Sequence, residues 1–558
     1  MNNRWIPTSL FLGLTLTYLS LSPGAISGMG YTMEEMRAGN GLIRKFDNLI
    51  HGRNAPANIR WSRNGIVPVV LNIPFLLIGE ADAFHNQFSQ ERVLGAEPVI
   101  DTALLLTIAF LWFRRLTNSQ SVSLLLTLAA GFGTLIWPYA YVGLETKQSL
   151  FLLLAAYLAL ASEAPRSWWR ALTFAGVCAC AVGAKSTGAF VVPAVLFLCW
   201  CYVGGDIWSR LRNRKLWVIL AVIFGVFLVN AYYRSIFWSH VGGAQKFILG
   251  WMIQDPVSYF VNVVSLFGSP NKALFLFVPV TIICLGILPA AYRANRDLTI
   301  FALLTLGGLV GGFAFLTNWA DETYGPRYLH SALVPLLLCF AAVYGTLSRP
   351  ARWAFYALAI LGIYPAFMGA LFRYGALHEV QQFTRQNTLQ ALQGDIVWNH
   401  IRFDSKLFSI WAQKQWGLKP NPLWTPRHQW FYPPAPPGAP VDPQVDLSSW
   451  AHPQAVLLNA WNDELTGVAA VTWHIYFSCL AVGLMLLLVC VLEIRRSSDA
   501  AAVLVPAPRL LLPVVLMAGI LTTTIFYFTD MPPDRAKYYT LTLNSWKRLI
   551  GLQPPGAK

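Results

Sequence analysis

The segment LTIFALLTLGGLVGGFAFLTNWADETYGPRYLHSALVPLLLCFAAVYGTL, residues 298–347, decides the fold class of this chain. It contains two apolar runs, 298–317 and 329–347, which are separated by the polar turn NWADETYGPRYLH at 318–330. Each run has the length of a helix that crosses a bilayer, roughly 17 to 25 residues. The segment therefore predicts two membrane-spanning helices joined by a short turn at one membrane surface, with Gly325 and Pro326 setting the bend.

Similar apolar runs recur along most of the 558 residues, of which 56% are hydrophobic and only 12% are charged. We therefore predict an all-α polytopic membrane protein with about 13 transmembrane helices. The clearer runs are 98–113, 121–143, 215–233, 272–292, 298–317, 329–347, 352–372, 470–493 and 507–528. Shorter or interrupted runs lie at 5–22, 147–162, 170–184 and 187–204. The first run also fits a cleaved signal peptide, but we expect an uncleaved helix that holds the following loop against the bundle.

The net charge of +15 is distributed as in a membrane protein. With a cytoplasmic N-terminus, every short loop assigned to the inside is basic, as the positive-inside rule requires. These loops contain Arg114/Arg115, Arg166/Arg170, Arg210/Arg212/Arg214/Lys215, Arg293/Arg296, Arg349/Arg352 and Arg495/Arg496. No basic stripe with interleaved aromatics supports a nucleic-acid partner. All eight cysteines lie in predicted spans, so we expect small buried side chains and no disulfide framework.

The chain is predicted to divide into a transmembrane core, residues 1–372, and a smaller exterior part. The core includes a first exterior loop at 23–97, in which Pro68 and Pro74 favour an interfacial segment over a full span. A second exterior loop is expected at 234–271. Residues 373–469, rich in proline and aromatics in their second half, form a small exterior domain before two last helices at 470–528 and an exterior tail at 529–558.

Ionisable residues next to spans are functional candidates because charge near hydrocarbon is costly. Under this topology one set lies at the outer membrane boundary: Glu34/Glu35, Glu145/Lys147, Lys185, Lys272 and Asp321/Glu322/Arg327. The alternative is that each is an ordinary interfacial residue reaching water. For Glu34 and Glu35 the alternative is a structural role at the start of a helix, with Thr32 as N-cap and Glu35 at position N3. The VGAKSTG stretch at 182–188 departs from the phosphate-loop pattern, and His330 is expected to be structural rather than a metal ligand.

Taken together, acids and fixed cations beside lipid suit a reaction on a lipid phosphate. In such a reaction a carboxylate deprotonates an acceptor hydroxyl while arginine or lysine holds the departing phosphate. A single displacement of this kind inverts the anomeric centre. No G-x-S-x-G elbow is present, so a hydrolytic triad has little support.

Six motifs, in order, resemble a family. They are YTMEEM (31–36), WSRNGIVPVVLNIPFLLIG (61–79), GFGTLIWPYAYVGLETKQSLFLLLAAYLAL (131–160), GAKSTGAFVVPAVLF (183–197), SPNKALFLFVPV (269–280) and WADETYGPRYLHSALVPLL (319–337). Together they resemble bacterial GT-C class glycosyltransferases, related to the protein O-mannosyltransferase and lipid A aminoarabinose transferase group. The resemblance runs from residue 1 to about residue 375.

The resemblance implies that the sugar donor is a polyprenyl-phosphate sugar dissolved among the membrane lipids. It also implies an active site on the extracytoplasmic face of a bacterial inner membrane. The catalytic base would be Glu35 or Glu34, and the acceptor would be a glycan, lipid or protein. The implied contacts to the donor phosphate are Arg327, Lys185 and Lys272, with Glu145, Asp321, Glu322, Tyr328 and His330 in supporting positions. Two of these cations are lysines where the family has arginine, and lysine lacks the bidentate fork of arginine.

The same sequence features also fit two classes of protein that are not enzymes. A transporter or flippase of a lipid-linked saccharide would use the same cations for binding alone, but it should place ionisable groups near mid-membrane. A non-catalytic scaffold could keep the fold. No cofactor is expected, although a divalent metal would fit if Glu34/Glu35 and Asp321/Glu322 converge.

Overall fold

The computed structural model is all-helical over the residues that it describes. These are 5–21, 30–50, 62, 64–81, 90–141, 143–162, 167–185, 187–241, 256–268, 273–316, 324–371, 407–408, 411 and 468–496. The predicted span at 507–528, the tail at 529–558 and almost all of the exterior domain at 373–469 lie outside the described residues. The predicted domain boundaries are therefore untested.

The first half of the chain contains helices α1 to α11. They are α1 (Trp5–Leu21), α2 (Gly30–Ile50), α3 (Ile66–Ala81), α4 (Gln90–Thr117), α5 (Gln120–Phe132), α6 (Ile136–Tyr139), α7 (Gly143–Ala156, continued by a π-helix Tyr157–Ala161), α8 (Trp168–Gly183), a 3₁₀ turn Gly188–Val191, α9 (Val192–Val203), α10 (Ile207–Arg212) and α11 (Arg214–Val241).

The second half continues the pattern with shorter pieces. They are α13 (Pro256–Gly268), α14 (Leu274–Phe277), α15 (Val280–Gly286), α16 (Leu288–Ala294), α17 (Arg296–Ala314), a 3₁₀ turn Arg327–Leu329, α18 (His330–Val343), a 3₁₀ turn Tyr344–Thr346, α19 (Arg349–Leu371) and α23 (Val468–Arg496).

Six helical segments of the described chain are long and apolar enough to cross a membrane. They are Ala96–Thr117, Gly143–Ala161, Arg214–Ile236, Arg296–Ala314, Arg327–Thr346 and Arg349–Leu371. Shorter apolar helices accompany them at Trp5–Leu21, Ile66–Leu77, Gln120–Phe132, Trp168–Gly183, Gly188–Val203 and Ser478–Leu492. The chain is thus a multi-pass helical membrane protein, and the full number of spans stays a prediction.

Several expected elements differ from those observed. The run 121–143 is not one helix, because α5 ends at Phe132 and α6 occupies only four residues. The run 272–292 is broken into α14, α15 and α16, with prolines at 279 and 289. The exterior loop expected from 234 starts later, because α11 continues to Val241. Helix α2 starts at Gly30, so Thr32 lies inside its first turn instead of capping it.

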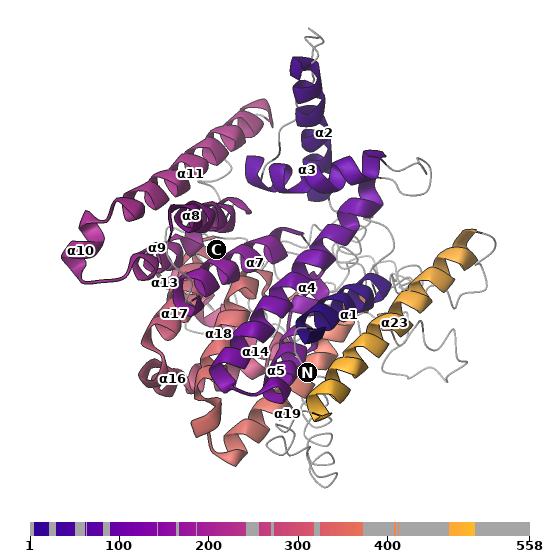
Figure 1. Cartoon of the computed structure of the whole chain (residues 1–558), viewed down its shortest axis with the longest axis vertical. Coiled ribbons are helices and arrows are strands. Elements are labelled where there is room, and N and C mark those ends of the chain that lie inside the picture. Colours follow the sequence, from indigo (N-terminus) through magenta and orange to yellow (C-terminus); the bar gives the residue numbers. More distant parts are fainter. Residues whose placement is uncertain are drawn as a thin grey trace, which may run out of the picture.

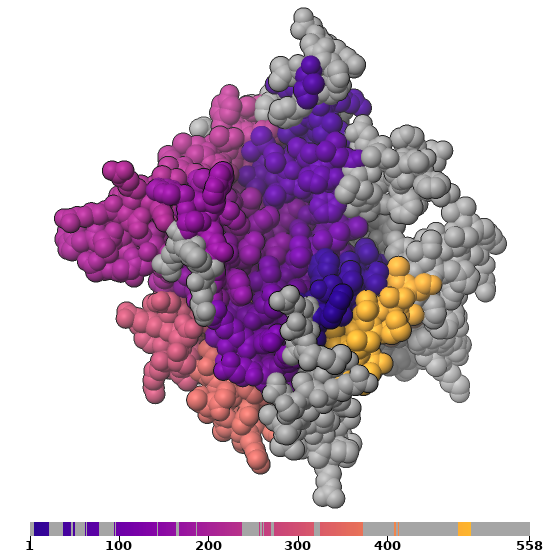
Figure 2. All heavy atoms as spheres, in the orientation of Figure 1, coloured from indigo at the N-terminus to yellow at the C-terminus, as the bar shows by residue number. Residues whose placement is uncertain are grey.

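Segments distant in the sequence pack side by side. Helix α23 runs along α1, as both views of the whole molecule show (Figures 1 and 2). Glycines permit this close approach, since a Cβ at Gly483 would lie 2.8 Å from Thr17 Oγ1 and 3.0 Å from the carbonyl oxygen of Gly13. Small residues that let helix backbones approach are a common basis of helix pairing in membranes.

Helices α4, α7 and α18 form the centre of the described bundle. Helix α7 packs against α4, α8 and α18, and α18 also packs against α17. The α18 side chains are buried almost throughout, from His330 to Val343. A helix enclosed on all sides can carry a polar group only if its neighbours supply partners, and those partners define the site described next.

Candidate functional site

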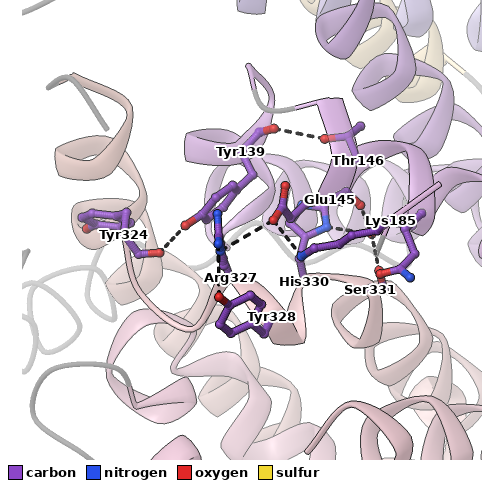
Figure 3. Close-up of polar contacts among 11 residues, drawn as sticks. Tyr139, Glu145, Thr146, Lys185, Tyr324, Arg327, Tyr328, His330 and Ser331 are labelled. Atoms are coloured by element: carbon purple, nitrogen blue, oxygen red, sulfur yellow. Dashed lines mark hydrogen bonds and ion pairs between the residues drawn. The ribbon is translucent and has the colours of Figure 1, made fainter. Parts of the chain in front are cut away.

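Three distant segments meet around the carboxylate of Glu145. Glu145 lies in the first turn of α7, Lys185 follows the end of α8, and Arg327 begins the 3₁₀ turn before α18. Lys185 Nζ is 2.8 Å from Glu145 Oε1, and Arg327 Nε is 3.7 Å from the same oxygen (Figure 3). We call these three side chains the Glu145 cluster.

Helix direction explains why the three residues meet. Helices α7 and α8 are consecutive neighbours joined by a short connection, so the start of α7 lies beside the end of α8. Arg327 is brought there by a bend at Gly325, whose φ of +55° is left-handed and favours glycine. Two tyrosine hydroxyls fix the bend: Tyr139 donates to the carbonyl of Tyr324, and Tyr324 donates to the carbonyl of Pro365 (Figure 3 shows the first).

The Glu145 cluster is largely buried. Glu145 is 2% exposed and Lys185 is 7% exposed, while Arg327 is partly buried. Two cations therefore meet at one carboxylate in a place where interactions between charges are stronger than in water.

An aromatic platform supports both cations. The Tyr328 ring is stacked on Phe313 with centroids 3.9 Å apart. Lys185 Nζ lies 4.9 Å and Arg327 Cζ 4.7 Å from the Tyr328 centroid, which are cation–π distances. Arg327 Nη2 also donates to the Tyr328 hydroxyl at 3.1 Å. The ring thereby holds the two cations next to each other despite their like charges.

A hydroxyl network lies on the other side of Glu145. Ser149, one turn further along α7, donates to the carbonyl oxygen of Glu145 at 2.8 Å. Its Oγ is 2.7 Å from His330 Nδ1 and 2.9 Å from the Oγ of Ser331. Ser331 in turn reaches Gln148 Oε1 at 3.4 Å. These contacts tie the start of α18 to the first turns of α7.

A second buried ion cluster uses Lys147, two residues after Glu145 on α7. Lys147 Nζ is 2.8 Å from each carboxylate oxygen of Glu97 on α4, and 2.8 Å from Asn72 Oδ1 on α3. All three residues are buried. We call this the Lys147 cluster, and it joins α3, α4 and α7.

The structure brings five of the sequence candidates together: Glu145, Lys185, Arg327, Tyr328 and His330. Helix α2 carries Glu34 and Glu35, but their side chains lie outside the described residues. Three further candidates, Lys272, Asp321 and Glu322, lie outside them altogether. Within the described ranges no group of three or more His, Cys, Asp or Glu side chains could hold a metal ion, and the expected convergence of Glu34/Glu35 with Asp321/Glu322 is untested.

Sequence reasoning missed the residues that complete the two clusters. Ser149 follows Glu145 by four positions and so shares its helix face, a spacing that could have linked the two. Glu97 and Asn72 gave no such signal, because their contacts to Lys147 span 50 and 75 residues.

Similarity to known proteins is visible in the fold and not in the sequence. No protein-family model and no curated protein matches the chain. Several solved structures match the chain at low sequence identity.

Two of these structures illustrate the likeness. ArnT from Cupriavidus metallidurans, solved bound to undecaprenyl phosphate, is 12% identical, with 88% of this chain and 77% of that chain covered at a TM-score of 0.43. The apo oligosaccharyltransferase of Archaeoglobus fulgidus is also 12% identical, with 70% of this chain and 59% of that chain covered at a TM-score of 0.40. At such identity the likeness concerns the fold alone.

Proposed function

We propose that this protein is a membrane glycosyltransferase that moves a sugar from a polyprenyl-phosphate donor to an acceptor hydroxyl at the extracytoplasmic surface. The observation that carries the proposal is the Glu145 cluster, in which a lysine and an arginine from separate helical segments meet at one buried carboxylate. An anionic ligand that is otherwise lipidic fits such a place, because its chain can stay in hydrocarbon while its charge is neutralised.

The two cations of the cluster suit the chemistry of a glycosyl phosphodiester. A polyprenyl-phosphate sugar carries one negative charge, which Lys185 and Arg327 would contact. When the bond to the anomeric carbon breaks, the departing polyprenyl phosphate gains a second negative charge. Lys185 and Arg327 would stabilise this developing charge in the transition state, and Glu145 would keep both cations in place.

The remaining roles follow from the sequence resemblance. Glu35 or Glu34 would take the proton from the acceptor hydroxyl, and a single displacement would invert the anomeric centre. Lys272 would be a third phosphate contact, with Asp321 and Glu322 in support. A bacterial inner membrane, with the site facing outward, is the proposed location.

The depth of the charges favours the enzyme over a transporter. Glu145 and Arg327 are the third and first residues of their candidate spans, Gly143–Ala161 and Arg327–Thr346. At 1.5 Å per residue along a helix, both lie within about one turn of a span's end. A transporter binding site is expected near mid-membrane, in broken helices.

The decisive experiment supplies purified protein with radiolabelled undecaprenyl-phosphate sugars and follows both transfer and movement between leaflets. Wild type should transfer sugar, and Arg327→Ala and Glu35→Gln should transfer it far more slowly. Arg349→Ala is the matched control, because Arg349 is exposed at the start of α19, beyond the far end of α18. Lipid movement without sugar transfer from any donor would refute the enzyme and support the transporter.

A further inference from the structure

Two buried acceptor atoms in the site have no hydrogen-bond partner within the described chain. They are Nε2 of His330 and Oε2 of Glu145. Both residues are 2% exposed. An unsatisfied buried polar atom costs about 1 to 3 kcal/mol, so two in one place point to a ligand that supplies donors.

The contacts of Ser149 indicate which nitrogen of the His330 ring carries the proton. Ser149 Oγ is 2.8 Å from the carbonyl oxygen of Glu145, which can only accept. In the tautomer that completes this hydrogen bond, His330 Nδ1, at 2.7 Å from the same Oγ, carries the ring proton and donates to Ser149. Nε2 of the neutral imidazole is then a bare acceptor.

Both acceptors lie beside the groups proposed to hold the phosphate. Oε2 belongs to the carboxylate whose Oε1 contacts Lys185 and Arg327. Ser149, which contacts both His330 Nδ1 and the carbonyl oxygen of Glu145, connects the histidine to the cluster, and the side chains of His330, Glu145, Lys185 and Arg327 gather in one place (Figure 3). The edge of the Tyr139 ring packs against the imidazole, with centroids 5.9 Å apart and planes at 75°. The ring is therefore held in place.

In a glycosyl phosphate, the hydroxyl nearest to the phosphate is the one at C2, next to the anomeric carbon. We propose that His330 Nε2 and Glu145 Oε2 accept hydrogen bonds from hydroxyls of the donor sugar, beginning with the C2 hydroxyl. The donor is then a sugar with a free C2 hydroxyl. This inference rests on the proposed function and adds to it the class of sugar and the residues that select it.

Binding to the purified full-length protein tests the inference without requiring transfer. The probes are undecaprenyl-phosphate glucose, undecaprenyl-phosphate mannose, their common 2-deoxy analogue and bare undecaprenyl phosphate, each displacing labelled undecaprenyl phosphate. Wild type should bind one 2-hydroxy donor about tenfold more tightly than the 2-deoxy analogue, the value of one hydrogen bond.

Two variants separate recognition from structure. The amide of His330→Asn reaches the position of Nδ1 and can donate to Ser149, but it leaves nothing at the position of Nε2. The amide oxygen of His330→Gln reaches the position of Nε2. We expect His330→Asn to lose the tenfold preference and His330→Gln to retain most of it, with equal affinity for bare undecaprenyl phosphate in all three proteins.

Three results would overturn the inference. The first is an equal loss of affinity for sugar-bearing and bare lipid in His330→Asn, which would make the histidine structural. The second is a wild type that binds neither sugar lipid better than the bare one. The third is a wild type without preference for the 2-hydroxy donor, which decides the matter even if the variants do not fold. Preferential binding without any transfer would instead refute the proposed enzyme and leave this sugar site standing.

Discussion

Helix α7 carries two buried ion clusters two residues apart, and they differ in how fully their groups are satisfied. In the Lys147 cluster one ammonium faces both oxygens of Glu97 and the oxygen of Asn72, all at 2.8 Å. In the Glu145 cluster two cations share one oxygen, the second of them at 3.7 Å, and Oε2 has no hydrogen-bond partner in the described chain.

The difference separates a structural contact from a binding site. In the Lys147 cluster both oxygens of Glu97 contact the ammonium, and the cluster holds α3, α4 and α7 together. In the Glu145 cluster one carboxylate oxygen is poorly satisfied, and a ligand that donates a hydrogen bond to it would improve it. Burial alone would not distinguish the two, since Glu97, Glu145 and Lys147 are all under 4% exposed.

The largest expected effect is on stability, in the closed cluster. Lys147→Met leaves the carboxylate of Glu97 buried without its cation, which should lower the free energy of unfolding by about 3 to 5 kcal/mol. Thermal unfolding in detergent measures this. Adding Glu97→Gln should recover part of the loss, because the uncompensated charge disappears.

Lys185→Met should lower the free energy of unfolding by less than Lys147→Met, because Arg327 still faces Glu145. An equal loss of stability in the two lysine variants would remove the distinction between the clusters.

The next effect is on activity, in the open cluster. Arg327→Ala should lower kcat/KM for sugar transfer by about 10²- to 10³-fold, as expected when a group placed to stabilise developing charge is removed. Its unfolding midpoint should stay near that of wild type. Transfer kinetics with labelled donor measure kcat/KM. Arg349→Ala is the control, because it removes an exposed arginine far from the cluster and should leave kcat/KM unchanged. Undiminished transfer by Arg327→Ala would exclude the arginine from catalysis.

A moderate effect is expected where the backbone positions the open cluster. In Gly325→Ala, a Cβ in the left-handed conformation costs about 1 to 2 kcal/mol. It would also lie 2.8 Å from Phe277 Cδ1. Both stability and transfer rate should fall, since Arg327 is two residues further on. Gly345→Ala is the matched control because a Cβ there meets nothing within 4 Å, and its stability and activity should be unchanged.

The smallest effect should come from the tyrosine platform. Tyr328→Phe removes the acceptor of Arg327 Nη2 but keeps the ring on Phe313, so the loss should be about 0.5 to 1.5 kcal/mol, or roughly two- to tenfold in kcat/KM. Tyr344→Phe, at the opposite end of α18, loses a hydroxyl contact to Tyr356 at 3.0 Å and should leave transfer unaffected. A similar loss in both variants would point to a general effect on α18.

The sequence predicted the class of fold well, because the bilayer imposes a length and an apolar composition that are visible locally. It predicted continuous spans where helices break, at 121–143 and 272–292. Average hydropathy does not report such breaks, because Gly133, Thr134 and Pro279 are single residues among strongly apolar neighbours. Where a protein neighbour covers an interrupted helix, the freed backbone groups can be satisfied within the bundle.

For the site, the sequence identified charged residues but not their pairing. Lys185 and Arg327 were expected to face the donor phosphate, and the structure adds that Glu145 already lies between them. Likewise, Lys147 stood two residues from Glu145 in the same motif, yet it belongs to another cluster. Pairing depends on which helices become neighbours, and contacts across 40 or more residues have no signature in a single sequence.

The pairing of α1 with α23 has a consequence for assembly. Gly13 and Gly483 are separated by 470 positions (483 − 13), which at 5 to 20 residues per second takes about 25 to 95 s to synthesise. During that time α1 can already pack on α4, but its face around Gly13 has no α23 to contact. The bundle is therefore completed late in biosynthesis, and a bulky residue at position 483 should impair this last step while leaving the earlier helices able to associate.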